Sequence, residues 1–150
     1  TSYSRQDLLD PAINVKIATD TMSRILDSYR RTGIRELQPN WHDPAWVLLF
    51  TKGWNDGYSN VHPGGGVGCV AKYLKARGIP VTHDNVFAHV DAAGCARYLK
   101  NPSSHAWQKT VTALFYEEGG PEADFIGTVF TVALIAGATW GAYKLWKEAS

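Results

Sequence analysis

The chain has 150 residues, a length suited to one domain of ordinary size. Its 15 Lys and Arg residues nearly balance 14 Asp and Glu residues, and no run of like charges forms a basic arm. The chain therefore lacks the positive field that binding of nucleic acid requires. The last part of the sequence is far more apolar than the rest, so we divide the chain into a body, residues 1–120, and a terminal segment, residues 121–150.

Two Asp-Pro pairs indicate where the first two helices begin. An aspartate can cap a helix, and a proline at the first helical position loses no hydrogen bond. The pair Asp10-Pro11 predicts a helix from Pro11 to Arg31, and the pair Asp43-Pro44 predicts a second helix that ends near Gly57. The first helix has an apolar stripe at three- and four-residue steps, formed by Ala18, Met22, Ile25, Leu26 and Tyr29.

The rest of the body is predicted to be loops and shorter helices. Five glycines and a proline make residues 57–68 a loop, because each glycine disfavours a helix by about 1 kcal/mol. Sustained alternation of apolar and polar residues is absent, so the predicted fold class is all-α. The expected helices are Val67–Arg77, Asp84–His89, Ala92–Lys100 and a fifth one capped by Pro102-Ser103-Ser104, with Trp107, Val111, Leu114 and Phe115 as its apolar stripe.

The terminal segment predicts a membrane-spanning helix from Phe125 to Trp146. These 22 residues carry no charge before Lys144, and about 20 apolar residues cross the ~30 Å hydrocarbon core of a bilayer. Acidic residues precede the segment and lysines follow it, so the positive-inside rule places the tail in the cytoplasm and the body on the periplasmic or outer side. The alternative is a buried central helix of a helical bundle.

Small residues recur at four-residue steps in the terminal segment. Ala133, Gly137 and Gly141 would share one face, where two helix backbones can approach closely. This pattern predicts a homo-oligomer formed through the terminal helix. The competing interpretation is the general abundance of glycine in membrane helices.

The residue types that most often carry chemistry show no local motif. The histidines His62, His83, His89 and His105 share no metal-ligand spacing and are interpreted as surface or loop residues, so no metal site is predicted. None of the five glutamates is placed as a sheltered general acid. Cys69 and Cys95 are interpreted as buried free thiols, with a disulfide as the alternative if the body lies outside the cytoplasm.

The segment Gly53–Tyr58 is the strongest candidate for a binding site. Trp54 offers a flat ring for stacking on a sugar, Asn55 an amide that both donates and accepts, and Gly57 a close approach to the backbone. Together with Tyr58, these residues are the predicted substrate-binding set. The alternative is an ordinary helix end with Trp54 in the core.

Two segments resemble the lysozyme-like lytic transglycosylases of bacteria and their phages. Residues Leu8–Ala18 resemble that family's Leu-x-Asp-Pro-x-x-Asn-Ile-x-x-Gly segment, and Trp54-Asn55-Asp56-Gly57 stands where the family has Tyr-Asn-Ala-Gly. The helix Trp107 to Glu118 resembles the one that closes the fold. The resemblance covers about Asp7 to Glu118, and it implies a lysozyme-like helical domain.

The resemblance also implies an activity, and this chain lacks residues that the activity requires. The family cleaves peptidoglycan glycan without water, using one glutamate as acid and then as base and leaving a 1,6-anhydro sugar, with no cofactor. That glutamate and the Gly-Leu-Met-Gln segment after it should precede Leu8, and neither is found, so no catalytic residue is assigned. The chain is interpreted as the C-terminal part of the domain, with the acid supplied either by a segment upstream of Thr1 or by a cleaved upstream fragment of the same protein.

Two functions follow from these observations, and a bundle-forming toxin ranks third. The first is a membrane-anchored lytic-transglycosylase-like protein that binds or locally opens cell-wall glycan, in phage infection or secretion, with a phage virion as one location. The second is a non-catalytic subunit of a membrane or ejection channel, in which a degenerate lysozyme-like body serves assembly. Retained Asn55 favours the first, and the lack of a sheltered glutamate favours the second.

Overall fold

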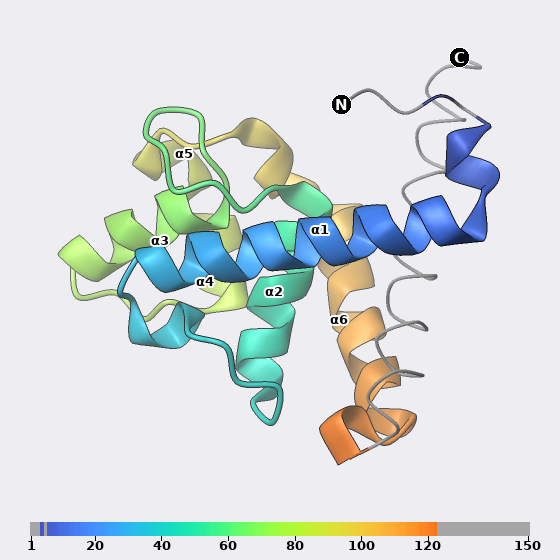
Figure 1. The fold of residues 1–150 in the computed structure, drawn as a ribbon. Helices are drawn as coiled ribbons and strands as arrows, with labels where there is room; N and C mark the ends of the chain where they lie inside the picture. Colours follow the sequence, from blue (N-terminus) through green and yellow to red (C-terminus); the bar gives the residue numbers. More distant parts are fainter. Residues whose placement is uncertain (1–3, 5, 123–150) are drawn as a thin grey trace.

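The computed structural model describes Ser4 and residues 6–122, and these residues fold into a set of packed helices (Figure 1). No strand occurs among them, which confirms the all-α prediction. The α-helices are α1 (Pro11–Arg31), α2 (Pro44–Asp56), α3 (Val67–Ala76), α4 (His83–Ala88), α5 (Val90–Ala93) and α6 (Pro102–Glu117). Short 3-10 turns are η1 (Asp7–Leu9), η2 (Arg35–Leu37), η3 (Arg97–Lys100) and η4 (Gly120–Glu122).

The predicted starts of the two long helices are confirmed by their caps. The Asp10 carboxylate accepts from the Ala12 amide at 2.8 Å, and the Asp43 carboxylate accepts from the Ala45 amide at 3.0 Å. Each bond satisfies an amide that has no partner within its helix. The predicted cap of α6 is wrong by one position, because Asn101 accepts from the amides of Ser103 and Ser104.

The stretch 92–100 is not the single helix that we expected. Helix α5 ends at Ala93 because Gly94 adopts φ 67°, a left-handed conformation that glycine reaches without steric cost. The chain then turns and forms η3. A glycine inside an apolar stretch therefore ended a helix that the pattern alone would have continued.

Helix α1 lies across α2, and a glycine permits the close crossing (Figure 1). The Tyr29 hydroxyl donates to the Leu49 carbonyl at 2.5 Å, and a Cβ placed on Gly53 would lie 2.3 Å from that hydroxyl. Any larger side chain at Gly53 would therefore displace the Tyr29 hydroxyl or shift the helix that carries it. This contact positions the last turn of α2, which carries the predicted binding residues.

Helix α6 packs along α2, and aromatic rings fill one end of their contact. The ring of Trp46 is 4.7 Å from that of Trp41 and 5.4 Å from that of Phe50, and Phe115 of α6 lies 6.2 Å from Trp41. The predicted stripe of α6 is only partly correct, since Leu114 is 42 % exposed. Gln108 and Thr112 face the core beside Val111 and Phe115 instead.

A disulfide joins Cys69 in α3 to Cys95 after α5. The interpretation as free thiols is therefore wrong, although both residues are buried as expected. The two segments lie side by side because the Gly64 amide donates to the Gly94 carbonyl and the Ala96 amide donates to the Gly65 carbonyl. This pairing is tertiary and could not be inferred from the cysteine spacing.

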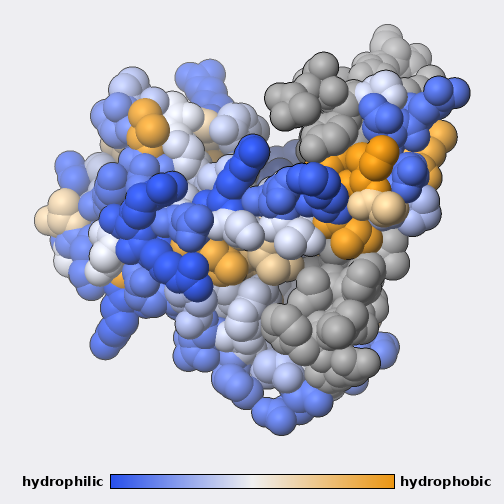
Figure 2. All heavy atoms as spheres, in the orientation of Figure 1, coloured by the Kyte–Doolittle hydropathy of each residue, from blue (hydrophilic) through white to orange (hydrophobic). Residues whose placement is uncertain are grey.

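Apolar side chains gather over the first half of α1, whereas its second half is more polar on the face seen in Figure 2. Leu9 is 75 % exposed, and Ile13, Val15 and Ile17 are half-buried. In the part of the chain that the structure describes, no helix combines the length and apolar character needed to span a bilayer. The predicted span Phe125–Trp146 and its residues Ala133, Gly137 and Gly141 lie outside the described residues.

Candidate functional site

The four predicted substrate-binding residues occupy one end of α2. Trp54 and Asn55 belong to its last turn, Gly57 caps it with φ 108°, and Tyr58 follows. All four are half-buried. The Trp54 ring lies 6.2 Å from Phe50, so one part of it packs on the core while another part remains accessible.

An exposed aromatic residue that the sequence did not indicate lies beside Gly57. Tyr98 of η3 is 58 % exposed, and a Cβ placed on Gly57 would lie 3.1 Å from its ring. Because Gly57 has no side chain, the Tyr98 ring packs directly against its backbone. The end of α2 thus carries the partly exposed Trp54, with the exposed Tyr98 beside it at Gly57.

The glycine-rich loop is held against the end of α2 by backbone hydrogen bonds. The Gly66 amide donates to the Ser59 carbonyl, and the Val67 amide donates to the Gly57 carbonyl. A Cβ on Gly66 would lie 2.1 Å from the Gly57 carbonyl oxygen, so the two backbones cross in contact. The loop is therefore a packed structure and not an open flap.

A buried ion pair lies on the inner side of the same helix end. The Lys52 ammonium is fully buried and donates to the Asp56 carboxylate at 3.0 Å and to the Leu99 carbonyl at 2.9 Å. Burial lowers the pKa of Lys52, and the carboxylate of Asp56 opposes that shift. A paired and hydrogen-bonded charge of this kind is strongly destabilising if one partner is removed.

Gln108 of α6 links the ion pair to the predicted binding residues and to a histidine. It is fully buried. Its Nε2 donates to Asp56 at 2.7 Å and to the Oδ1 of Asn55 at 3.1 Å. Its Oε1 lies 2.6 Å from the Nε2 of His83. Asn55 is thus fixed through its oxygen, and none of the described residues bonds to its Nδ2, which stays available to donate to a ligand.

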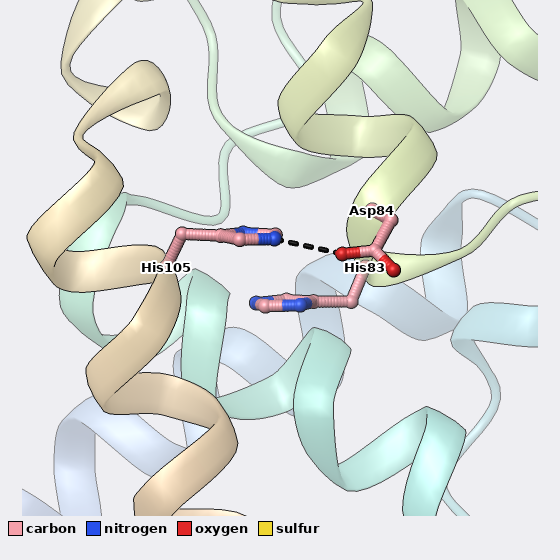
Figure 3. Close-up of side chains that lie close together, drawn as sticks. All are labelled: His83, Asp84 and His105. Carbon is pink, nitrogen blue, oxygen red and sulfur yellow. Dashed lines mark hydrogen bonds and ion pairs between the residues drawn. The ribbon is translucent and has the colours of Figure 1, made fainter.

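Two histidines and an aspartate meet where α4 faces α6 (Figure 3). The rings of His83 and His105 stack in parallel at 4.0 Å, with 3° between their planes. The Nε2 of His105 lies 2.8 Å from the Asp84 carboxylate. Figure 3 shows the His105 ring over the His83 ring, with the Asp84 carboxylate at the edge of the stack.

His83 and Asp84 differ in charge at pH 7 because their surroundings shift their pKa values for different reasons. Burial, as the largest cause, lowers the pKa of His83 to about 4, so His83 is neutral at pH 7. Hydrogen bonds from Lys109 and then from His105 lower the pKa of Asp84, which is therefore ionised. One donor atom from each of His83, Asp84 and His105 lies within 4.8 Å of the others, a donor set able to hold a metal ion.

The histidine cluster was missed because no sequence signal carries it. His83 and His105 lie on different helices, and ligand motifs such as His-x-x-x-His detect only residues on one helix face. Gln108 was missed because an amide beside a tryptophan gives no indication of burial. Asn55 is the one predicted residue that the structure brings into this polar network.

Comparison of the chain with protein families, with curated proteins and with solved structures finds no match.

Proposed function

We propose that this chain is the C-terminal part of a lysozyme-like lytic-transglycosylase domain, and that the end of α2 binds peptidoglycan glycan strands. The resemblance motivates this proposal, and the main support is the arrangement around Asn55. Its oxygen accepts from Gln108, and its Nδ2 has no hydrogen-bond partner among the described residues. The partly exposed Trp54 belongs to the same helix end, and the exposed Tyr98 lies beside Gly57. A fixed amide donor at a helix end that also carries exposed aromatic side chains suits a pyranose ring with its N-acetyl and hydroxyl groups.

The proposed role is glycan binding, with the catalytic acid supplied from outside residues 1–150. Among the described glutamates, Glu117, Glu118 and Glu122 are exposed. Glu36 is 3.6 Å from both Lys75 and Arg35, and its own backbone amide, followed by these cations, lowers its pKa. A general acid needs the opposite shift. The predicted helix Phe125–Trp146 would hold the body at a membrane.

Co-sedimentation with purified sacculi tests glycan binding. The full chain in detergent is expected to sediment with sacculi, and Asn55→Ala is expected to weaken binding about fivefold, as loss of one hydrogen bond near 1 kcal/mol implies. Tyr98→Ala should weaken it to a similar degree through loss of stacking. The matched control is Asn40→Ala, an exposed amide before the opposite end of α2.

Two outcomes would contradict glycan binding. One is a wild-type chain that stays in the supernatant. The other is equal binding by the Asn55→Ala and Asn40→Ala variants, each with an unchanged helical circular dichroism spectrum.

The second candidate function is a non-catalytic membrane or ejection-channel subunit, assembled through the Gly137 face of the terminal segment. The exposed or ion-paired state of every described glutamate favours it. The two candidates differ in product. The native protein that contains this chain releases 1,6-anhydro sugars from sacculi under the first candidate and releases none under the second.

A further inference from the structure

We propose that His83, Asp84 and His105 form a binding site for Zn²⁺, opening to solvent on the Asp84 side. The inference is separate from glycan binding and does not depend on it. It stands on the geometry of the three side chains and on a hydrogen-bond chain that determines which nitrogen of His83 is available.

The hydrogen-bond chain begins at the ion pair and fixes the orientation of the Gln108 amide. An ionised carboxylate only accepts hydrogen bonds, so the group that lies 2.7 Å from Asp56 is the donating Nε2 of Gln108. The other end of that amide is therefore the accepting Oε1, and it faces His83. Lys52 donates to the same carboxylate oxygen.

The orientation of Gln108 then fixes the tautomer of His83. Because Oε1 can only accept, the Nε2 of His83 carries the proton, and the Nδ1 of the neutral ring presents a lone pair. This Nδ1 is buried and has no hydrogen-bond partner among the residues that the structure describes, in a residue only 4 % exposed. A buried nitrogen lone pair without a partner is uncommon, and a metal ion would satisfy it.

The other two donors complete a set that zinc prefers. The His105 imidazole and the ionised Asp84 carboxylate already lie 2.8 Å apart, and a nitrogen of His83 is within 4.8 Å of both. Two imidazoles and one carboxylate, with water as the fourth ligand, are a known tetrahedral zinc set. Gln108 would support the site from behind, as groups that accept the second N–H of a ligating histidine commonly do.

Binding through Nε2 of His105 requires its proton, now donated to Asp84, to move to Nδ1, and it also requires two local movements. Parallel rings place their lone pairs in parallel planes, so the His105 ring has to tilt out of the stack, against its contact with Phe87 at 4.3 Å. Lys109, whose side chain is half exposed, lies 3.0 Å from Asp84 and has to swing into solvent. His83 is held by Gln108 and stays in place.

The test is Zn²⁺ titration of the tag-free full chain by calorimetry, with Co²⁺ absorption as the readout of geometry. One equivalent of Zn²⁺ should bind, and Co²⁺ should give the visible bands of a tetrahedral ion with nitrogen ligands. His105→Ala and Asp84→Asn should each weaken binding more than tenfold, and Gln108→Leu should weaken it roughly 10–100-fold as loss of a supporting partner does. The matched control is His42→Ala, an exposed histidine at the opposite end of α2.

Two of these variants are expected to fold normally, so weaker Zn²⁺ binding by them would report the loss of a metal ligand. Asp84 is exposed and His105 lies in the first turn of α6, so each of these variants should keep the wild-type circular dichroism spectrum. Absence of stoichiometric Zn²⁺ binding by the wild-type chain overturns the proposal. So does a pattern in which His105→Ala and Asp84→Asn bind as tightly as wild type, or in which His42→Ala abolishes binding.

Discussion

The two ends of the contact between α2 and α6 are built from opposite kinds of side chain. At one end, the rings of Trp46, Phe50 and Phe115 pack with Trp41. At the other end, Gln108 bonds to Asp56 in a network of charges and amides. The aromatic end gains from removal of apolar area, which requires no particular direction. The polar end is favourable only when every donor meets an acceptor, so it determines one arrangement of the helices more strictly.

Trp46→Ala is expected to give a large loss of stability and tests the aromatic end. Trp46 is 1 % exposed, and its Nε1 donates to the Leu37 carbonyl at 3.1 Å. Removal of a buried tryptophan lowers the free energy of unfolding by about 3–5 kcal/mol. Urea unfolding followed by circular dichroism measures this change. A loss below about 1 kcal/mol, the size typical of surface changes, would mean that the aromatic rings do not hold the helices together.

Asp56→Ala tests the polar end and should lower the free energy of unfolding by about 3–5 kcal/mol, because it leaves the Lys52 ammonium buried without its counter-charge. The double variant Lys52→Met, Asp56→Leu should recover most of that loss, since an apolar pair of similar size is often as stable as a buried ion pair. The control is Asp20→Ala, which breaks an exposed pair with Lys16 and should change stability by less than about 1 kcal/mol. Equal losses in the single and double variants would contradict the comparison.

Lowering the pH is expected to destabilise the polar end of the contact between α2 and α6 and to leave the aromatic end unchanged. The pKa of His83 is about 4 in the folded protein and 6.5 in the reference state, because burial disfavours the charged ring, as do His105 and Lys52. Gln108 and Asp84 oppose this shift. Between these two values the unfolded chain binds more protons, so stability falls as the pH drops from about 6.5 to 4, by about 3 kcal/mol in all.

The measurement is urea unfolding at a series of pH values with a chelator present. His83→Asn, which retains a polar group facing Gln108, should flatten the dependence in that window. Trp46→Phe should leave the slope unchanged, because the aromatic end contains no group that titrates there. A slope that persists in His83→Asn would assign the acid sensitivity to other groups.

The sequence was sufficient to predict the helices whose ends are marked by local signals. Asp-Pro pairs and terminal glycines depend on the backbone within one helical turn, and for this reason α1 and α2 were predicted with nearly correct ends. The end of α5 was missed because Gly94 could equally have been tolerated inside a longer helix. Helix boundaries inside a continuous apolar stretch depend on tertiary packing.

The polar site could not be predicted because its members show their roles only in three dimensions. The predicted stripe of α6 was correct at Val111 and Phe115 but missed Gln108 and Thr112, since Trp107 and Leu114 outweigh these polar residues in any hydrophobic pattern. The buried glutamine is stable there only because Asp56, Asn55 and His83 satisfy it. Those partners come from two other helices, and no spacing in the sequence joins them.

The close contact between the backbones at Gly57 and Gly66 limits which groups at this end of α2 could bind a ligand. The carbonyls of Gly57, Tyr58 and Ser59 already accept from amides between Gly66 and Cys69, so the backbone there has little capacity left for a ligand. Selectivity must reside in the side chains around it. The two main chains are held in place by their mutual contact. The protein would therefore lose little conformational entropy when a ligand binds, and the surface is preorganised.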